Sequence, residues 1–171
     1  PFIAKNNFGK VIFDLRNNLG GLFLTAQEIL YAFAKNEDDI IVTTRSRANE
    51  EIIRVKDRKE DFFQPVSKTV KEPGTLKNIP LVVLINHQSM SASELVAGTL
   101  QDWGRAIIIG ELSFGKGIGQ LSFPLSDGSV FKLTTFEILA GNGKRFIHKT
   151  GIKPDIEVSW MPKEKQLQDA F

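Results

Sequence analysis

Short apolar runs separated by polar turns recur along the first two thirds of the chain. Residues 10–15 (KVIFDL), 80–86 (PLVVLIN) and 106–109 (AIII) are rich in branched aliphatic side chains, and residues 39–44 have a similar character. A continuous apolar run of this length, bounded by turn residues, is typical of a buried strand. The pattern therefore predicts four strands in this part of the chain.

Two longer segments between these runs carry apolar residues at helical spacing. Residues 22–35 follow the turn sequence NNLGG, and residues 89–102 begin with three serines at alternate positions followed by Glu94. Polar residues at the start, and Gly104 just beyond the end, are typical of helix boundaries. The order strand, helix, strand, helix, strand favours right-handed βαβ units at the centre of the domain.

The last third of the chain has the character of an antiparallel sheet. Residues 120–124 and 129–135 predict two strands around a Ser-Asp-Gly turn, and residues 154–158 predict a short closing strand. Together the elements indicate one mixed α/β domain over residues 1–171. We also expect glycine turns at 115–119 and 141–143, a terminal helix at 163–171, and irregular structure with one or two short strands at 45–79.

Composition excludes several classes of protein. Hydrophobic residues make up 42% of the chain and charged residues 25%, which is typical of a soluble globular domain. The net charge of +2 does not indicate a nucleic-acid partner, and no apolar run reaches the roughly 18 residues of a membrane span. The absence of cysteine excludes disulfides and thiolate sites, and two histidines, His87 and His148, argue against zinc. Because the chain begins with Pro1, we expect a piece of a longer protein.

A glycine-rich stretch at residues 110–117 (GELSFGKG) resembles a phosphate-binding loop but lacks an essential residue. Such a loop needs Ser or Thr after its lysine to hold magnesium, and Gly117 stands there instead. The loop should also open a helix, which Gly119 and Pro124 disfavour. The sequence therefore argues against nucleotide binding.

Ser91 and Lys116 are candidates for nucleophilic catalysis. Ser91 stands at a predicted strand-to-helix turn, where its hydroxyl would be exposed near a helix N-terminus. Neither His87 nor His148 has a recognisable partner as a base. Lysine serves as a base when it is neutral, a form that burial beside apolar residues such as Phe114 would favour. From the residues alone, a helix-capping serine and a solvated loop lysine remain the competing interpretation.

Four stretches resemble the C-terminal processing proteases, also called tail-specific proteases. Residues 11–21 (VIFDLRNNLGG) are similar to D-L-R-x-N-x-G-G, and residues 89–111 to S-A-S-E-x-x-A-x-x-x-Q-D-x-G-R-A. Residues 114–120 (FGKGIGQ) match F-G-K-G-x-x-Q, and residues 151–158 (GIKPDIEV) match G-I-x-P-D. Two positions depart from the family pattern: Leu19 replaces a frequent proline, and Met90 replaces a small residue.

The resemblance implies a role for each matching residue. Ser91 would be the nucleophile, Lys116 the general base, and Gln120 the residue that holds the lysine amine. The N–H of Ala92 and that of a glycine in the NNLGG turn would form the oxyanion hole. Gly20 and Gly21 both remain candidates for the second donor. For the remaining motif residues the resemblance implies supporting or structural roles. These residues are Asp102, Asp14, Arg16 and Arg105.

The resemblance also implies a fold and a function. It indicates a crotonase-like α/β protease core with βαβ units, acting as a serine endopeptidase that cleaves proteins near their C-termini without a metal or cofactor. The alternative is a non-catalytic binding or scaffold module on the same fold. Family members usually carry a PDZ domain, act outside the cytoplasm, for example in the periplasm, and bind polypeptides with apolar C-termini. We therefore expect these properties of the full-length protein, and a homo-oligomer is compatible with them.

Overall fold

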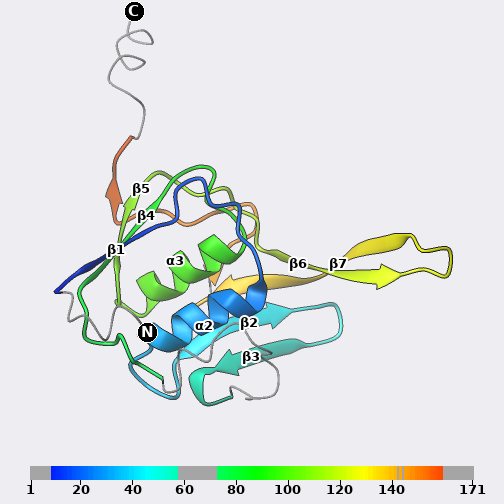
Figure 1. Ribbon diagram of the computed structural model, residues 1–171, viewed down its shortest axis with the longest axis horizontal. Helices are drawn as coiled ribbons and strands as arrows, with labels where there is room; N and C mark the ends of the chain where they lie inside the picture. Colours follow the sequence, from blue (N-terminus) through cyan, green and yellow to red (C-terminus); the bar gives the residue numbers. More distant parts are fainter. Residues whose placement is uncertain (1–8, 58–72, 142, 144, 160–171) are drawn as a thin grey trace, which may run out of the picture.

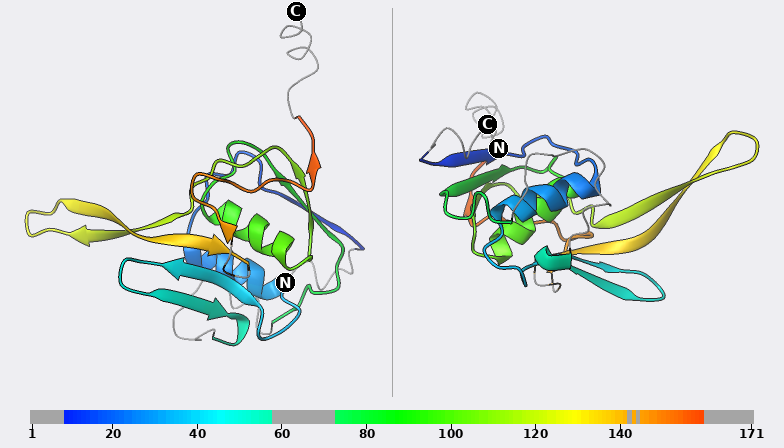
Figure 2. Two further views of the ribbon diagram at one scale, coloured as in Figure 1. Left: turned by 180° about the vertical axis from the view of Figure 1, so that it is seen from behind. Right: turned by 60° about the horizontal axis from the view of Figure 1, so that its bottom comes forward.

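The computed structural model describes residues 9–57, 73–141, 143 and 145–159, and it has three layers. A parallel sheet and an antiparallel sheet lie on opposite sides of the two helices, α2 (Phe23–Phe33) and α3 (Ala92–Asp102) (Figures 1 and 2). The prediction of a mixed α/β fold is confirmed. The expected helix at 163–171 lies outside the described residues, and no described helix is long and apolar enough to cross a membrane.

The parallel sheet has the strand order β1-β4-β5-β9, with all its neighbouring strands parallel. Helix α3 connects β4 to β5 as the predicted βαβ unit. Buried aliphatic residues on β4 and β5 face the helices, as the apolar runs indicated. The strands of this sheet are β1 (Val11–Asp14), β4 (Leu81–Ile85), β5 (Ile107–Gly110) and β9 (Ile156–Glu157).

The antiparallel sheet has the order β3-β2-β7-β6, with β8 paired to β7. The expectation that the strand after the first helix completes a central βαβ unit is wrong, because β2 pairs antiparallel with both β3 and β7. The short strand expected within residues 45–79 is β3. The elements of this sheet are β2 (Ile40–Arg45), β3 (Glu50–Arg54), the 3₁₀ turn η1 (Val55–Asp57) that follows it, β6 (Ile118–Pro124), β7 (Val130–Ala140) and β8 (Arg145–Phe146).

Strands β6 and β7 are longer than predicted and form a hairpin that projects from the body of the domain (Figures 1 and 2). Strand β7 continues to Ala140 because its second half pairs with β2, with Val42 opposite Ala140. Strand β6 already begins at Ile118, so part of the expected glycine turn is strand. Beyond the body, apolar side chains on the two strands face each other across the ladder while remaining exposed: Leu121 opposite Leu133, and Phe123 opposite Phe131.

The two helices pack against each other and against both sheets, and this positions the start of α3. Leu95 and Leu100 are fully buried on the inner side of α3. Gly98 lets the helix approach its neighbours, since a Cβ atom there would lie 2.7 Å from Ile152 and 2.9 Å from Ala140. Such spacing is shorter than any real carbon–carbon contact, so α3 is seated closely on the antiparallel sheet.

The outer face of the parallel sheet is apolar. Strand register places Ile12, Val82 and Ile107 in one row across it, with Ile12 70% exposed and Ile107 51% exposed. A second row on the same face holds Ile109 opposite Ile156. Parallel sheets are usually covered on both faces, which explains why the sequence of these strands is apolar at nearly every position.

Candidate active site

Ser91 occupies a strained turn between β4 and α3. Its backbone has φ 58° and ψ −118°, a region that residues other than glycine rarely adopt. Such strain costs on the order of 1–3 kcal/mol and persists only where the surroundings enforce it. The N–H of Ser91 donates to the Glu94 carboxylate at 2.8 Å, and the C=O accepts from the amides of Glu94 and Leu95. The turn therefore presents Ser91 just before the N-terminus of α3.

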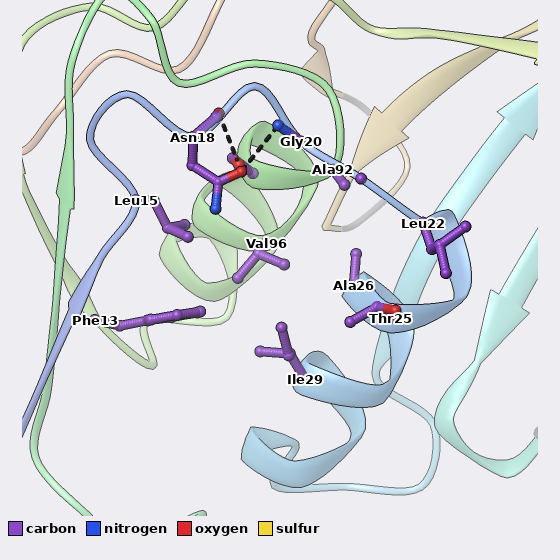
Figure 3. A pocket seen from close by; sticks show the side chains of 12 residues that line it. Phe13, Leu15, Asn18, Gly20, Leu22, Thr25, Ala26, Ile29, Ala92 and Val96 are labelled. Carbon is purple, nitrogen blue, oxygen red and sulfur yellow. Dashed lines mark hydrogen bonds between the residues drawn. The ribbon is translucent and has the colours of Figure 1, made fainter. Parts of the chain in front are cut away.

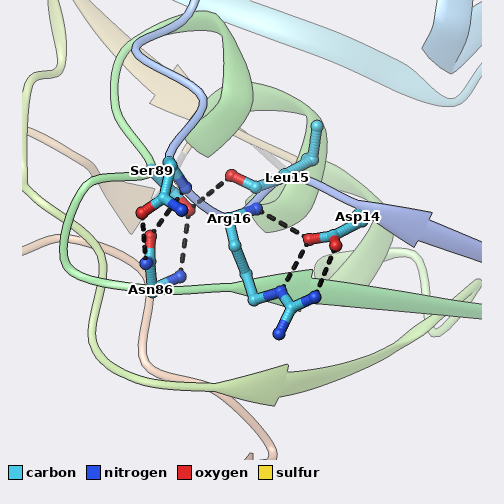
Figure 4. A network of polar contacts seen from close by, with 6 residues as sticks. Asp14, Leu15, Arg16, Asn86 and Ser89 are labelled. Atoms are coloured by element: carbon cyan, nitrogen blue, oxygen red, sulfur yellow. Dashed lines mark hydrogen bonds and ion pairs between the residues drawn. The ribbon is translucent and has the colours of Figure 1, made fainter. Parts of the chain in front are cut away.

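A network of polar contacts ties this turn to the loop that follows β1 (Figure 4). The buried hydroxyl of Ser89 donates to the Leu15 carbonyl at 2.7 Å and accepts from the Asn86 amide at 3.0 Å. The Asn86 side chain accepts from the Asn17 N–H at 2.9 Å and donates to the Asn17 side chain at 2.8 Å. These contacts connect residues more than 60 positions apart. The NNLGG loop and the turn that holds Ser91 therefore form one unit.

Asp14 and Arg16 brace the same loop from outside, as predicted. The Arg16 guanidinium donates to both Asp14 oxygens, at 2.9 and 2.7 Å (Figure 4). These hydrogen bonds lower the pKa of the Asp14 carboxyl. Because this pKa is lower in the folded protein than in the unfolded chain, the ionised carboxylate stabilises the fold at a pH above the unfolded-state pKa. This stabilisation is lost as the pH falls through the folded-state pKa. Because the pair is exposed, its contribution to stability is small.

The two glycines of the NNLGG loop play different structural parts. Gly20 has φ 92°, and a Cβ atom there would lie 2.7 Å from the Met90 carbonyl oxygen and 3.0 Å from the Ala92 nitrogen. Its N–H donates to the Asn18 side chain at 2.9 Å. Gly21 has open space where a side chain would stand, and its N–H has no partner among the described residues. Gly20 therefore serves close packing, and the free donor belongs to Gly21.

Lys116 lies on the loop before β6, and the carboxylate of Glu94 connects this loop to Ser91. One Glu94 oxygen accepts from the N–H of Ser91 and from that of Lys116, each at 2.8 Å. The two backbones are therefore only two hydrogen bonds apart. Between the side chains of Ser91 and Lys116, both described, the structure has no hydrogen bond. Lys116 is half-buried and Phe114 is 58% exposed, so the expected apolar cover does not come from Phe114.

The structure gives the other two expected residues, Gln120 and Asp102, partners away from Ser91 and Lys116. The Gln120 amide is exposed and donates to Thr134 at 3.3 Å rather than to Lys116. Asp102 lies at the opposite end of α3 from Ser91, about 16 Å away along the helix axis. There its carboxylate packs against Gly141, where a Cβ atom would lie 2.3 Å from it. Asp102 therefore supports the fold beyond reach of the Ser91 hydroxyl.

Arg105 is structural, as expected. Its guanidinium is buried, and it donates to the carbonyl oxygens of Leu76 at 2.6 Å and Ile79 at 2.5 Å. The same group lies 5.2 Å from the ring centre of Phe33. Burial lowers the pKa of this arginine. Arg105 therefore anchors the segment before β4 and contributes nothing directly to the site.

Neither histidine is hydrogen-bonded to Ser91. His87 is exposed, with Nδ1 3.0 Å from a Glu111 oxygen. His148 lies beside the Lys116 loop through its backbone, close to Gly117, and its Nδ1 has no partner in the part of the chain that the structure describes. The described residues also include no cluster of His, Cys, Asp or Glu that could hold a metal ion. Lys116 is the base candidate whose backbone shares a hydrogen-bond acceptor, the Glu94 carboxylate, with Ser91.

A pocket opens beside the oxyanion-hole candidates (Figure 3). It has a volume of about 140 Å³ and lies between β1 and the first turns of α2 and α3. Its walls are mostly apolar, and the backbone of Gly20, Gly21 and Ala92 forms its rim. The side chains that line it come from three segments: Phe13, Leu15 and Asn18; Leu22, Thr25, Ala26 and Ile29; and Ala92, Ser93 and Val96.

Sequence reasoning missed the role of Glu94. At the third position of a helix that begins after serine, a glutamate predicts a capping box and nothing more. Its further contacts reach a loop about 20 residues away, which no local pattern indicates. Of the two residues that depart from the family pattern, Met90 joins the two turns, since its N–H donates to the Asn18 carbonyl at 3.1 Å, and Leu19 is exposed.

Comparison with known proteins assigns this arrangement to a family. The profile of peptidase family S41 matches residues 2–158. A Staphylococcus aureus protein named "Probable CtpA-like serine protease" is 32% identical over 95% of this chain, which spans 30% of that relative. The photosystem II D1 C-terminal processing protease superposes with a TM-score of 0.72 at 30% identity, over 92% of this chain and 36% of that one. A lipoprotein from Streptococcus agalactiae shares the fold, with a TM-score of 0.69 at 22% identity over 94% of this chain and 54% of that one.

Proposed function

Because the chain belongs to peptidase family S41, we propose that it forms the catalytic core of a serine endopeptidase that cleaves proteins near their C-termini. Ser91 is the nucleophile and Lys116 the general base. The observation that carries the proposal is the strained Ser91 turn, held by the same carboxylate oxygen as the Lys116 backbone. The chain spans about a third of the length of its relatives, so the activity belongs to the protein in its natural length.

The reaction is an acyl transfer. The neutral Lys116 amine takes the Ser91 proton while the hydroxyl oxygen bonds to the substrate carbonyl carbon. The same lysine then gives its proton to the departing amine as the peptide C–N bond breaks. Water then gives a proton to the lysine and attacks the resulting ester, and the lysine returns that proton to the departing Ser91 oxygen, which releases the acid and free Ser91. Each step balances without a metal or cofactor.

The oxyanion hole uses the N–H groups of Ala92 and Gly21. Ala92 opens α3, so its N–H has no carbonyl within the helix to bind. The N–H of Gly21, which lines the pocket, has no partner among the described residues, whereas that of Gly20 donates to Asn18. Two preorganised donors of this kind stabilise the charge that develops on the substrate oxygen. The bonded state of the Gly20 N–H supports Gly21 over Gly20 as the second donor.

The pocket receives the side chain before the cleaved bond. Its volume of about 140 Å³ is close to the roughly 150 Å³ of an apolar cavity known to hold benzene. Aliphatic side chains such as those of Val and Leu fit this space, while a Trp side chain is too large. Substrate main chain would lie extended beside the sheet edge at the start of β6. These features support a preference for apolar residues at the cleavage site.

Ile29→Ala should enlarge the pocket and shift the substrate preference. Ile29 lines the pocket from α2, and its removal gives a bulky aromatic side chain more room. We expect kcat/KM for a peptide with Phe before the cleaved bond to rise relative to the Ala peptide by about 10-fold or more. The matched control is Leu24→Ala on the same helix, which lies outside the pocket and should leave the ratio unchanged. An equal shift in both variants would contradict this assignment of the pocket.

A covalent probe separates the proposed protease from a binding or scaffold module on the same fold. A fluorophosphonate should label Ser91 of the protein in its natural length, and peptide mapping should locate the adduct on residue 91. A peptide with an apolar C-terminus should be cleaved by the same preparation. A scaffold protein would bind such a peptide without labelling or cleavage, and that outcome would reject the protease.

The proposal extends to partners and location. We propose that a PDZ domain presents substrate tails to the site, that the protein acts outside the cytoplasm, in the periplasm or cell envelope, and that it assembles with further copies of itself. The family resemblance supports the PDZ domain and the location and is compatible with the assembly, and the greater length of the relatives leaves room for the additional domain. Cell fractionation with an antibody against this chain tests the location, and light scattering tests the assembly.

A further inference from the structure

Glu94 is a buried carboxylate with hydrogen-bond donors on both of its oxygens. Its side chain is fully buried, and its two oxygens accept four hydrogen bonds. The donors are the N–H groups of Ser91, Gly115 and Lys116 and the hydroxyl of Ser113, at 2.5 to 2.8 Å. An ionised carboxylate has about four lone-pair sites and no donor, so these partners use its capacity fully.

The four bonds connect two separate segments of the site. One oxygen joins the Ser91 and Lys116 backbones directly. The other holds Gly115 and Ser113, and the Ser113 hydroxyl in turn accepts from the Ile152 N–H at 2.7 Å. Gly115 has φ 90°, so the loop turns sharply around the carboxylate. Glu94 therefore lies at the junction of the nucleophile turn, the Lys116 loop and the segment before β9.

A helix-capping role explains only one of these contacts. In a capping box the glutamate at the third helical position accepts from the N–H of the capping residue, here Ser91. The other three donors lie 19 to 22 residues along the chain. An exposed glutamate would cap the helix equally well, so its complete burial points to a second role.

We propose that Glu94 is a positioning residue that sets the distance between the nucleophile and the base of the proposed protease. It touches neither substrate nor the reacting atoms and acts through the backbones of Ser91 and Lys116. The effect of Glu94 on catalysis rests on the proposed function. The bridge between the two segments, which consists of its four hydrogen bonds, does not. Only a carboxylate of this length meets the requirement. Glutamine would direct an NH₂ group at two donors, and aspartate would fall short by one methylene.

Glu94→Gln tests the proposal, with Thr99→Val as the matched control. Thr99 is equally buried on the same helix, about 12 Å from Ser91 along its axis, and its hydroxyl bonds to Ile41 and Gly141. The protein in its natural length is labelled with a fluorophosphonate under conditions in which each variant is folded by circular dichroism. We expect Glu94→Gln to slow labelling by at least about 100-fold, since small misplacements at a reacting centre have such effects, with Thr99→Val near wild type.

Amide hydrogen exchange gives a second readout that does not depend on activity. In Glu94→Gln, the amides of Gly115 and Lys116 should exchange at least about tenfold faster, while those of β4 stay protected. If the wild-type protein is not labelled, the proposed protease function is rejected. The amide-exchange result then still tests whether Glu94 holds the two segments together. If Glu94→Gln does not fold, Ser113→Ala replaces it, with a smaller loss in the same direction. The proposal is overturned if Glu94→Gln is labelled at the wild-type rate, if the amide exchange of that variant is unchanged, or if Thr99→Val slows labelling equally.

Discussion

Ser91→Ala and Lys116→Ala should each reduce kcat for peptide cleavage by at least about 10⁴-fold. The first change removes the atom that bonds to the substrate, and the second removes the amine that accepts its proton. The residual rate would come from substrate binding and the oxyanion hole, which neither change removes. Cleavage of an internally quenched peptide by the protein in its natural length measures the effect over this range.

The controls use residues of the same type at exposed positions. Ser122 lies on the projecting part of β6, and the exposed Lys153 side chain forms a surface ion pair with Glu157. Ser122→Ala and Lys153→Ala should therefore cleave like wild type. The double variant Ser91→Ala/Lys116→Ala should be no slower than either single variant, because residues that act as a unit have non-additive effects. Retention of most of the activity by Lys116→Ala would exclude the dyad.

Gly20→Ala should reduce kcat by about 100-fold or more, whereas Gly21→Ala should not. A methyl group at residue 20 would overlap the Met90 carbonyl oxygen, the Ser91 Cβ atom and the Ala92 nitrogen. It would also stand on a left-handed backbone, with φ 92°, that disfavours any side chain. The loop must then move away from the nucleophile turn, which separates the two oxyanion donors. Turnover of a saturating peptide substrate measures the loss.

Gly21→Ala is the matched control for this prediction. The neighbouring position has no atom within 4 Å of an added Cβ atom, and its backbone is not left-handed. The substitution also keeps the N–H that we assign to the oxyanion hole. Thermal unfolding of both variants separates a loss of catalysis from a loss of fold. Equal losses of kcat at the two positions would show that both glycines are needed for their size rather than for distinct roles.

The sequence predicted most of the individual elements and supplied the site residues that we propose. Strands β1 and β4 and helices α2 and α3 follow from local patterns, because apolar spacing and turn residues act over a few positions. The four motifs selected Ser91 and Lys116 over a helix cap and a loop lysine. The strand β2 was predicted as well, but local patterns did not predict the sheet in which it pairs or the full length of β7. Pairing between strands about 90 residues apart depends on which apolar faces meet in the folded chain.

By itself, the sequence determined that this chain is a mixed α/β domain of a protease family, with a serine and a lysine in matching positions. Only the tertiary structure decided how that site is assembled. It separated Gly20, which packs under the nucleophile turn, from Gly21, whose N–H is free, and it gave Glu94 three further partners besides its helix cap. The physical reason is that local spacing specifies helices, strands and turns, whereas the hydrogen-bond partners of a buried group depend on which distant segments the core brings together.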